Sequence, residues 1–288
     1  MVAWLDEILD TLEAQPACGY LQGQSLATEP TALAALALQG HGRNQRALAA
    51  ASHLADAQNA DGSLGVGLGQ TDPGWPTSLA VLAWLAIDDR QFQSRVQRAC
   101  QWILDAHGEP LERSSEMGHD TTLIGWAWVG GTHSWLEPSA LHVIALKAAG
   151  FGQHVRAREA VKLLFDRTLP AGGCNYGNTT VLGQTLLPHM QPTGIAMLAL
   201  TGELDQGGRI AKSLGYLRRT LDGRSTAASL SWALLGLAAH DVDIAEAEAR
   251  LAQAASRVAT HDRSPHKQAL LALAALGEQA PLIKLIQH

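Results

Sequence analysis

Hydrophobic and polar positions divide this chain into two kinds of helical segment that alternate. One kind is amphipathic with a charged face, and it covers roughly residues 2–15, 44–58, 92–107, 153–168, 206–221 and 242–260. The other kind follows each amphipathic segment, is rich in Ala and Leu, and is apolar on almost every side. Because a helix that is apolar all round must be enclosed, we expect these segments to form an inner ring within an outer one.

A short recurring motif marks where the apolar helices are expected to begin. Proline suits the first turn of a helix, since its missing N–H loses no hydrogen bond there and its φ is already helical. A sixth start is predicted at Ser225 or Thr226, which can cap a helix. The other five are Glu29-Pro30-Thr31, Trp75-Pro76-Thr77, Glu137-Pro138-Ser139, Gln191-Pro192-Thr193 and Ser264-Pro265-His266. The pattern predicts an all-α fold, an α/α toroid of six helical hairpins or (α/α)6 barrel, forming a single domain over residues 1–288.

The connections from outer to inner helix are uneven in length. They are long from Gly62 to Trp75, from Gly108 to Glu137 and from Ala171 to Gln191, and short at 222–224 and 261–263. In repeat architectures such insertions gather on one face, which is often the binding face. We therefore expect a site at the end of the ring where the inner helices begin. The final segment, 281–287, is expected to pack against the closing hairpin.

Charge and composition exclude several classes of partner. The 21 basic and 27 acidic residues give a net charge of −6 without a basic run, so nucleic acid is not an expected partner. The longest apolar runs are shorter than the roughly 18 residues of a membrane span, which predicts no transmembrane segment. The acidic, amphipathic N-terminus does not resemble a secretory signal, and three scattered cysteines do not form a disulfide framework. These features predict a cytoplasmic protein and leave its oligomeric state open.

Three sequence elements carry a resemblance to a known superfamily. In residues 50–64 the expected outer helix ends at Gln58, and Asp61-Gly62-Ser63-Leu64 follows. This arrangement resembles the QW repeat of squalene-hopene cyclases, with Leu in place of Trp. Gly172-Gly173-Cys174 and the 125–128 segment resemble further copies. The chain is thus similar to the terpenoid cyclase and protein prenyltransferase superfamily, with its prenyltransferase and squalene oxidase repeat. This resemblance implies an α/α toroid that binds an isoprenoid or other apolar ligand in its cavity.

The catalytic motifs of that superfamily are incomplete here. In Met117-Gly118-His119-Asp120-Thr121, only the last Asp of the Asp-x-Asp-Asp acid motif of cyclases is present. None of the three cysteines forms the Asp-x-Cys pair that binds zinc in prenyltransferases. Residues 88–92 lack the third Asp of a magnesium-diphosphate motif. The spacing of the Cys and His residues is unlike that of a compact metal site. We therefore expect no metal ion and no cofactor, and a zinc site formed by Cys174, His133, His189, Glu137 and His266 stays open as the alternative.

Candidate site residues come from the inner-helix starts and the long insertions. A carboxylate beside an imidazole in an apolar site can act as an acid/base pair, which predicts catalytic roles for Glu137, His133, Asp120 and His119. The predicted ligand-binding residues are Glu29, Trp75, Trp126, Trp128, Trp135, Cys174, Tyr176, His189, Gln191 and His266. Structural roles stay open for all of them, since Glu at a helix start complements the helix dipole and Trp can plug the toroid.

Three functions remain open from the sequence. The first is a terpenoid cyclase- or prenyltransferase-like protein that binds an isoprenoid or other apolar ligand and performs cyclase or prenyl-handling chemistry with an unusual acid. The second is a non-catalytic binding or scaffold toroid that has lost the catalytic motifs of the superfamily. The third is a carbohydrate-active toroid in which Glu137 and Asp120 act as paired carboxylates.

Overall fold

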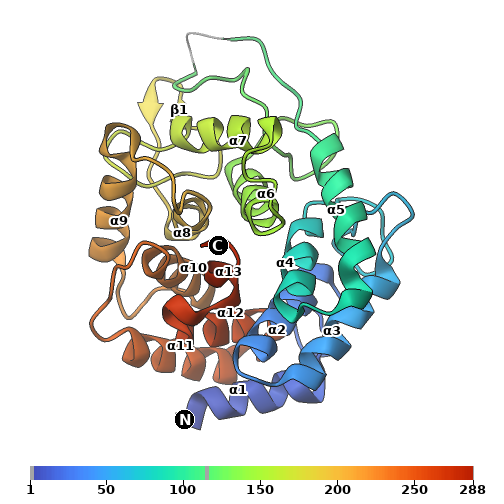
Figure 1. Cartoon of the computed structure of the whole chain (residues 1–288). Helices are drawn as coiled ribbons and strands as arrows, with labels where there is room; N and C mark the ends of the chain where they lie inside the picture. Colours follow the sequence, from blue (N-terminus) through green and yellow to red (C-terminus); the bar gives the residue numbers. More distant parts are fainter. Residues whose placement is uncertain (1–2, 114–116, 288) are drawn as a thin grey trace.

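The computed structural model describes residues 3–113 and 117–287. Two concentric rings of helices form the α/α toroid, as predicted (Figure 1). The outer helices are α1 (Ala3–Ala14), α3 (Asn44–Ala57), α5 (Gln93–Asp105), α7 (Val155–Asp166), α9 (Arg209–Thr220) and α11 (Ala247–His261). The inner helices are α2 (Thr28–Gly40), α4 (Thr77–Ile87), α6 (Leu136–Ala148), α8 (Met190–Ala199), α10 (Ala227–Ala238) and α12 (Pro265–Ala275).

The inner helices pack against one another in chain order, and α12 returns to α2, so the ring is closed. Their Ala- and Leu-rich surfaces are buried on all sides, which is why the apolar pattern has no polar face. The closest approach joins α8 to α10. A Cβ on Gly194 would lie 2.3 Å from the carbonyl oxygen of Trp232, so only glycine allows the two backbones to meet there.

The predicted helix starts are confirmed in all six hairpins. Pro265 is the first residue of α12, and Pro76 directly precedes α4. Pro30, Pro138 and Pro192 lie in the first turns of α2, α6 and α8. The start without proline, at α10, is capped by the Thr226 hydroxyl, which accepts a hydrogen bond from the backbone N–H of Ser229 at 3.2 Å.

The end of the ring where the inner helices finish is closed by the C-terminal segment. The 3-10 helix η3 (Gly277–Gln279) leads into α13 (Pro281–Lys284), which lies near the middle of the ring in Figure 1. Helix α13 packs against η3, α2 and α4. The sequence predicted contact with the closing hairpin, and the structure shows contact with inner helices of the first and second hairpins as well. Leu282 and Ile283 are buried there.

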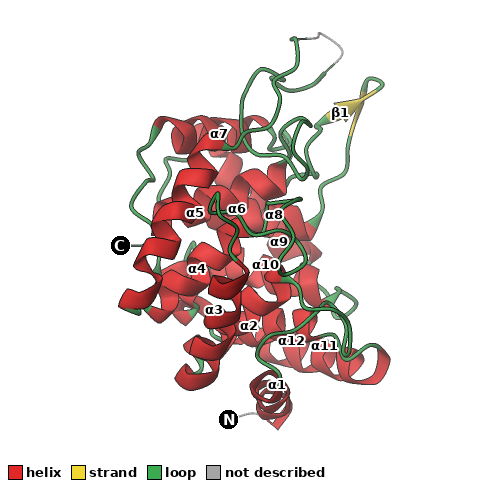
Figure 2. Ribbon diagram, turned by 90° about the vertical axis from the view of Figure 1, so that its right-hand side faces the viewer, coloured by secondary structure: helices red, strands yellow, loops and turns green. Residues whose placement is uncertain are grey.

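The long insertions lie at the opposite end, which we call the mouth: the end of the ring at which the six inner helices begin. Figure 2 shows the C-terminus on one side of the ring and the β1 hairpin on the other. Strands β1 (Thr180–Val181) and β2 (Gln184–Thr185) pair antiparallel within the α7–α8 connection. Two further 3-10 helices, η1 (Arg90–Phe92) and η2 (Gln206–Gly208), precede α5 and α9. Within the described residues, no helix is both long and apolar enough to cross a membrane.

Candidate functional site

Four inner helices place a polar side chain in their first turn, at the mouth. These residues are Glu29 on α2, Glu137 on α6, Gln191 on α8 and His266 on α12. Each lies next to the proline of the recurring motif, so the same local signal that begins the helix also sets the height of the side chain. Helix α6 is the neighbour of α8, and α12 is the neighbour of α2, which makes two pairs around the ring.

Glu137 is the most unusual of these side chains. It is 4% exposed, and its Oε1 is buried without a hydrogen-bond partner. Burial raises the pKa of Glu137 to about 7, the side-chain amide of Gln191 lowers this pKa, and the negative charge of Glu29 raises it. The N-terminus of a helix favours a carboxylate, so burial outweighs the helix dipole here. Glu137 is therefore a carboxylic acid that can hold its proton near neutral pH.

Glu29 has the opposite environment, because both of its oxygens are engaged. The Tyr20 hydroxyl donates to Oε2 at 2.7 Å, and Nε2 of His266 lies 3.2 Å from Oε1. The rings of Tyr20 and His266 are 5.4 Å apart, so they bracket the carboxylate. Burial and the charge of Glu29 both raise the pKa of Tyr20, which keeps its hydroxyl a donor. The mouth thus joins one buried acid with one carboxylate held by two partners.

Aromatic side chains from the insertions gather in pairs at the same end. Trp75 and Trp128 meet edge to face with ring centroids 4.8 Å apart. His133 lies 4.6 Å from Trp135, and Tyr176 lies 5.1 Å from His189. Tyr176 is 41% exposed, and burial followed by the charge of Glu137 raises its pKa. An exposed aromatic ring therefore lies within electrostatic reach of the buried acid.

The predicted catalytic residues other than Glu137 lie in a separate group. Asp120 accepts hydrogen bonds from the hydroxyl of Thr122 and from Arg113, both at 2.6 Å. The buried ring of His119 faces the Thr179 hydroxyl at 3.5 Å. Asp120 is not among the charges that act on Glu137, whereas Glu29 is. The structure thus brings Glu137 together with Glu29 and Gln191, while His119 and His133 line a small pocket in the α5–α6 connection.

Two of the predicted ligand-binding residues are buried in the core. Trp126 is 2% exposed, and its indole N–H donates to the carbonyl oxygen of Ile103 at 2.8 Å. Cys174 is fully buried, burial raises the pKa of its thiol to about 12, and its backbone N–H donates to the Thr193 hydroxyl. Among the described residues, no group of three or more His, Cys, Asp or Glu side chains could hold a metal ion.

Sequence reasoning missed two residues that matter at this end of the ring. Tyr20 lies in the α1–α2 connection and donates to Glu29, and ring closure brings His266 from the last hairpin to the same carboxylate. Arg167 follows α7 and is buried, although the amphipathic pattern gives arginine an exposed face. No helix signal marks Tyr20, which lies in a connection, and the role of Arg167 depends on His119 and His133, which are distant in sequence.

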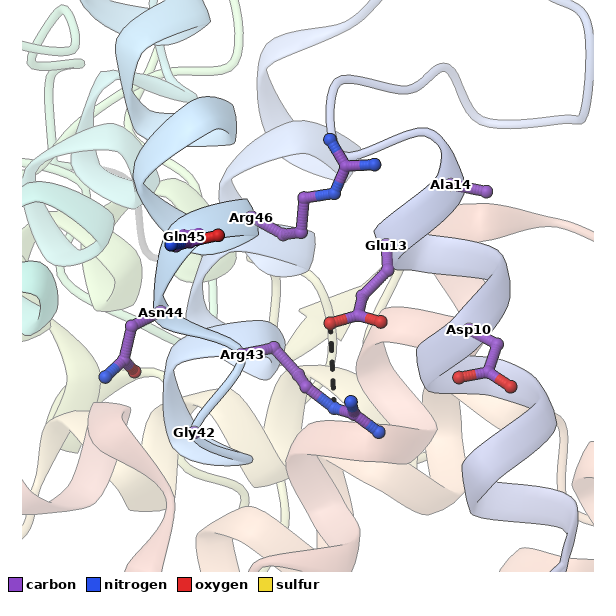
Figure 3. Close-up of a pocket in the computed structure, with 8 residues that line it drawn as sticks. All are labelled: Asp10, Glu13, Ala14, Gly42, Arg43, Asn44, Gln45 and Arg46. Carbon is purple, nitrogen blue, oxygen red and sulfur yellow. Dashed lines mark ion pairs between the residues drawn. The ribbon is translucent and has the colours of Figure 1, made fainter.

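A further depression lies elsewhere, on the outer ring. It measures about 580 Å³ and is formed by the end of α1 and the start of α3 (Figure 3). The ion pair between Arg43 and Glu13, at 3.7 Å, spans it, and both side chains are partly exposed. It contains no buried titratable group, so we do not assign a site there.

Solved structures share this fold at low sequence identity. A protein from Actinoplanes aligns with a TM-score of 0.56 and 14% identity over 92% of this chain and 81% of its own. Two glycosidase variants, one of them in complex with glucose, each align with a TM-score of 0.58 and 11% identity over 99% of this chain and 97% of theirs. No protein-family model and no curated protein matches the sequence. Identities this low establish the fold alone.

The predicted membership of the terpenoid cyclase and protein prenyltransferase superfamily is wrong, and the predicted isoprenoid or other apolar ligand falls with it. The solved structures that match over nearly the whole chain include glycosidases, and no family model supports a cyclase or a prenyltransferase. The physical reason lies in what the QW-like elements do. Gln58 donates to the carbonyl oxygens of Gly62 and Arg95 and accepts from Arg98, so it fastens α3 to α5. A toroid of any function needs such contacts between outer helices. The QW-like residues therefore indicate the fold and not a cyclase or prenyltransferase activity.

Proposed function

We propose that this protein is a glycoside hydrolase in which Glu137 donates the proton to the leaving group and Glu29 is the second carboxylate. One observation carries the proposal: a buried acid whose pKa is raised to about 7 lies within electrostatic reach of a carboxylate on another inner helix. Glycoside hydrolysis generally requires two carboxyl groups in different environments, one that holds a proton and one that does not.

Each side chain has a role that follows from its contacts. A general acid works best when its pKa lies near the working pH, and burial provides this for Glu137. Tyr20 and His266 hold the carboxylate of Glu29 in one orientation, so it can serve as a base toward water or as a nucleophile. Gln191 supports the charged form of Glu137 after the proton has left. Trp75, Trp128 and Tyr176 supply aromatic faces on which a sugar ring can pack.

Two findings favour a glycoside as the substrate over the alternatives. The first is that structures with the same fold include glycosidases, one of them in complex with glucose. The second is that the mouth holds two carboxyl groups in different environments, as glycoside hydrolysis requires. The sequence suggested Asp120 as the partner of Glu137, and we replace it with Glu29. The carboxylate of Asp120 is engaged by Arg113 and Thr122 and does not act on Glu137.

Hydrolysis of a panel of α- and β-linked aryl glycosides and oligosaccharides tests the proposal. The wild-type protein should cleave at least one member, and Glu137→Gln should lower kcat by about 10³-fold, as expected for loss of a general acid. Glu112→Gln is the matched control, because Glu112 is an exposed residue of the connection that leads to α6. It should leave kcat unchanged. The anomer released, read by NMR, tells a nucleophilic role for Glu29 (retention) from a base role (inversion).

The outcomes of this panel are separable. No turnover of any glycoside, or full turnover by Glu137→Gln, overturns the proposal. Sugar binding without cleavage, detected as a rise in Tm that Glu137→Gln retains, shows a carbohydrate-binding toroid and also overturns hydrolysis.

A further inference from the structure

A small pocket of about 110 Å³ lies in the insertions, apart from the paired carboxylates. The α5–α6 connection supplies His119 and His133, the residue after α7 is Arg167, and the α7–α8 connection supplies Asn178. Two connections that are distant in sequence, α5–α6 and α7–α8, thus bring an arginine, two imidazoles and an amide to one pocket. All four side chains can donate hydrogen bonds, which is the chemistry that recognises an oxyanion.

Arg167 is the centre of this pocket and is incompletely partnered. Its side chain is 4% exposed. Nη1 donates to the carbonyl oxygen of Gly177 at 2.6 Å and Nη2 to that of Asp120 at 3.4 Å, while Nε is buried without a hydrogen-bond partner. Nε forms an ion pair with Asp166, whose Oδ2 is 3.5 Å away, and that oxygen also accepts a hydrogen bond from the backbone N–H of Asp120. A buried guanidinium with a free donor is costly unless an anion completes it.

The two imidazoles report the electrostatic field of the pocket. Burial and then the positive charge of Arg167 lower the pKa of His119 to about 4. The same two causes, in the same order, lower the pKa of His133. The neighbouring acids Asp166 and Asp120 act on His119 in the opposite direction and do not cancel these effects. Both rings are therefore neutral at pH 7, each with one N–H to donate.

Other charged groups around the pocket leave this balance in place. Glu109 lines the pocket and is exposed, so water screens its charge. Asp120 is paired with Arg113, whose side chain is 73% exposed. Lys and Asp side chains are absent from the described residues that line the pocket. The buried guanidinium thus has no equally buried carboxylate opposite it within the pocket.

We propose that this pocket binds a single small oxyanion, a phosphate, sulfate or carboxylate group, held by Nε of Arg167 with the rings of His119 and His133 as further donors. The anion supplies the hydrogen-bond acceptor that Nε lacks and adds to the partly exposed Asp166 in offsetting the cost of burying the guanidinium. It also reverses the sign of the field on the two rings, so both imidazoles become easier to protonate when the anion is present. Binding therefore strengthens as the pH falls.

The pocket is connected to the mouth through one aromatic contact. The ring of His133 lies 4.6 Å from that of Trp135, which comes two residues before Glu137. This step rests on the proposed function: if Glu137 cleaves a glycoside, the pocket holds an acidic substituent on that glycoside. The anion site itself does not depend on catalysis, so the two ideas can fail separately.

Calorimetric titration with sodium sulfate tests the site, because the charge of sulfate does not change between pH 5.5 and 8. We expect saturable binding to one site with a Kd of about 1 mM, tighter by about 5-fold or more at pH 5.5 than at pH 8. Arg167→Gln should abolish binding. If that variant does not fold, His133→Asn replaces it, since His133 is only partly buried, and should weaken binding by about 5-fold at pH 5.5. Arg113→Gln, which removes the same charge from the exposed part of the α5–α6 connection, should leave the Kd unchanged.

Histidine NMR titrations give a second readout that does not depend on the variants. Sulfate should raise the pKa values of His119 and His133 and leave the NMR signals of His41 and His240, at the closed end of the ring, unchanged. Equal sulfate affinity for wild type and His133→Asn, or a larger loss in Arg113→Gln than in Arg167→Gln, overturns the proposal. So does an unchanged titration of His119 and His133.

A comparison of glucuronate with glucose separates a sugar-borne anion from a free ion. Competition of glucuronate with sulfate at this site, with no competition by glucose, supports a carboxylate carried on a sugar. Sulfate binding that glucuronate does not displace supports an inorganic anion and removes the link to the glycoside while keeping the site.

Discussion

The two ends of the inner ring both carry buried titratable side chains, and these side chains differ in how completely they are hydrogen-bonded. At the closed end, Lys147 donates to the carbonyl oxygens of Ala199 and Thr201 at 2.8 and 2.9 Å and pairs with Glu203 at 2.8 Å. At the mouth, Glu137 is buried with one oxygen unpartnered. Lys147 and Glu203 at the closed end complete their hydrogen bonds with each other and with nearby carbonyl groups, whereas Glu137 at the mouth has one oxygen without a partner.

The histidines follow the same division. Nε2 of His240 lies 2.8 Å from the carbonyl oxygen of Met197, and Nε2 of His41 lies 2.9 Å from that of Ala272. Both satisfy carbonyl groups near the ends of inner helices, which lack partners within the helix. His266, at the mouth, faces the carboxylate of Glu29 instead. Groups that complete hydrogen bonds stabilise the fold, and a buried group that is left incomplete is a mark of function.

The largest expected effect separates the two ends by activity. Glu29→Gln should lower the kcat for a cleaved glycoside by about 10²-fold or more, because the amide cannot act as base or nucleophile. The side chain keeps an acceptor for the Tyr20 hydroxyl, so the Tm should change little. Steady-state kinetics and thermal unfolding measure the two quantities. An unchanged kcat would remove Glu29 from the reaction.

A substitution at the closed end should do the reverse. Lys147→Met leaves Glu203 without one of its two cationic partners and two carbonyl oxygens without a donor. We expect the free energy of unfolding to fall by about 3 kcal/mol, measured by urea titration, with kcat unchanged. Lys162→Met, on the exposed face of α7, is the control and should cost little. Loss of kcat in folded Lys147→Met would contradict the division between the two ends.

His142 lies in the middle of α6, between the two ends of the ring, and should make the stability of the fold sensitive to acid. It is fully buried, stacked on Trp126 at 5.0 Å, and burial lowers its pKa from 6.5 to about 4. Since the unfolded chain binds the proton more readily, its contribution is present above pH 6.5 and is lost as the pH falls through 4. The loss is on the order of 3 kcal/mol. His142→Phe should flatten the dependence of unfolding free energy on pH in this window, and an unchanged slope would contradict the assignment.

Glu137 should show the opposite dependence on the same helix. Burial raises its pKa from 4.5 to about 7, so its favourable contribution is present below pH 4.5 and is lost as the pH rises through 7. At pH 8 the free energy of unfolding of Glu137→Gln should therefore exceed that of wild type by on the order of 3 kcal/mol, and at pH 4 the two should be equal. An inactive variant that is more stable only at alkaline pH would show that the mouth trades stability for chemistry.

The smallest effect concerns the tuning of Glu137. Gln191→Met removes an amide that favours the charged carboxylate, so the pKa of Glu137 should rise further. The alkaline limb of the kcat profile should move to higher pH, while the acidic limb stays in place. A shift in the other direction would show that Gln191 does not act on the charged form.

Much of the fold could be read from local features of the chain. The alternation of amphipathic and apolar helices and the prolines at 30, 76, 138, 192 and 265 predicted the two rings and five helix starts, because helix initiation depends on neighbouring residues. The same features misled the choice of superfamily. Gln58 and Gly62 resemble a cyclase repeat, yet they fasten α3 to α5, a requirement of the toroid and not of a reaction.

The sequence by itself determined the two kinds of helix and the position of Glu29, Glu137, Gln191 and His266 in the first turns of the inner helices, since both follow from short-range helix signals. Only the tertiary structure decided which of these side chains meet. The environment of a titratable group depends on burial and on charges brought from other hairpins, and these arise when α12 closes on α2. For that reason the structure selects Glu29 over Asp120 as the carboxylate that acts on Glu137, and no local pattern does.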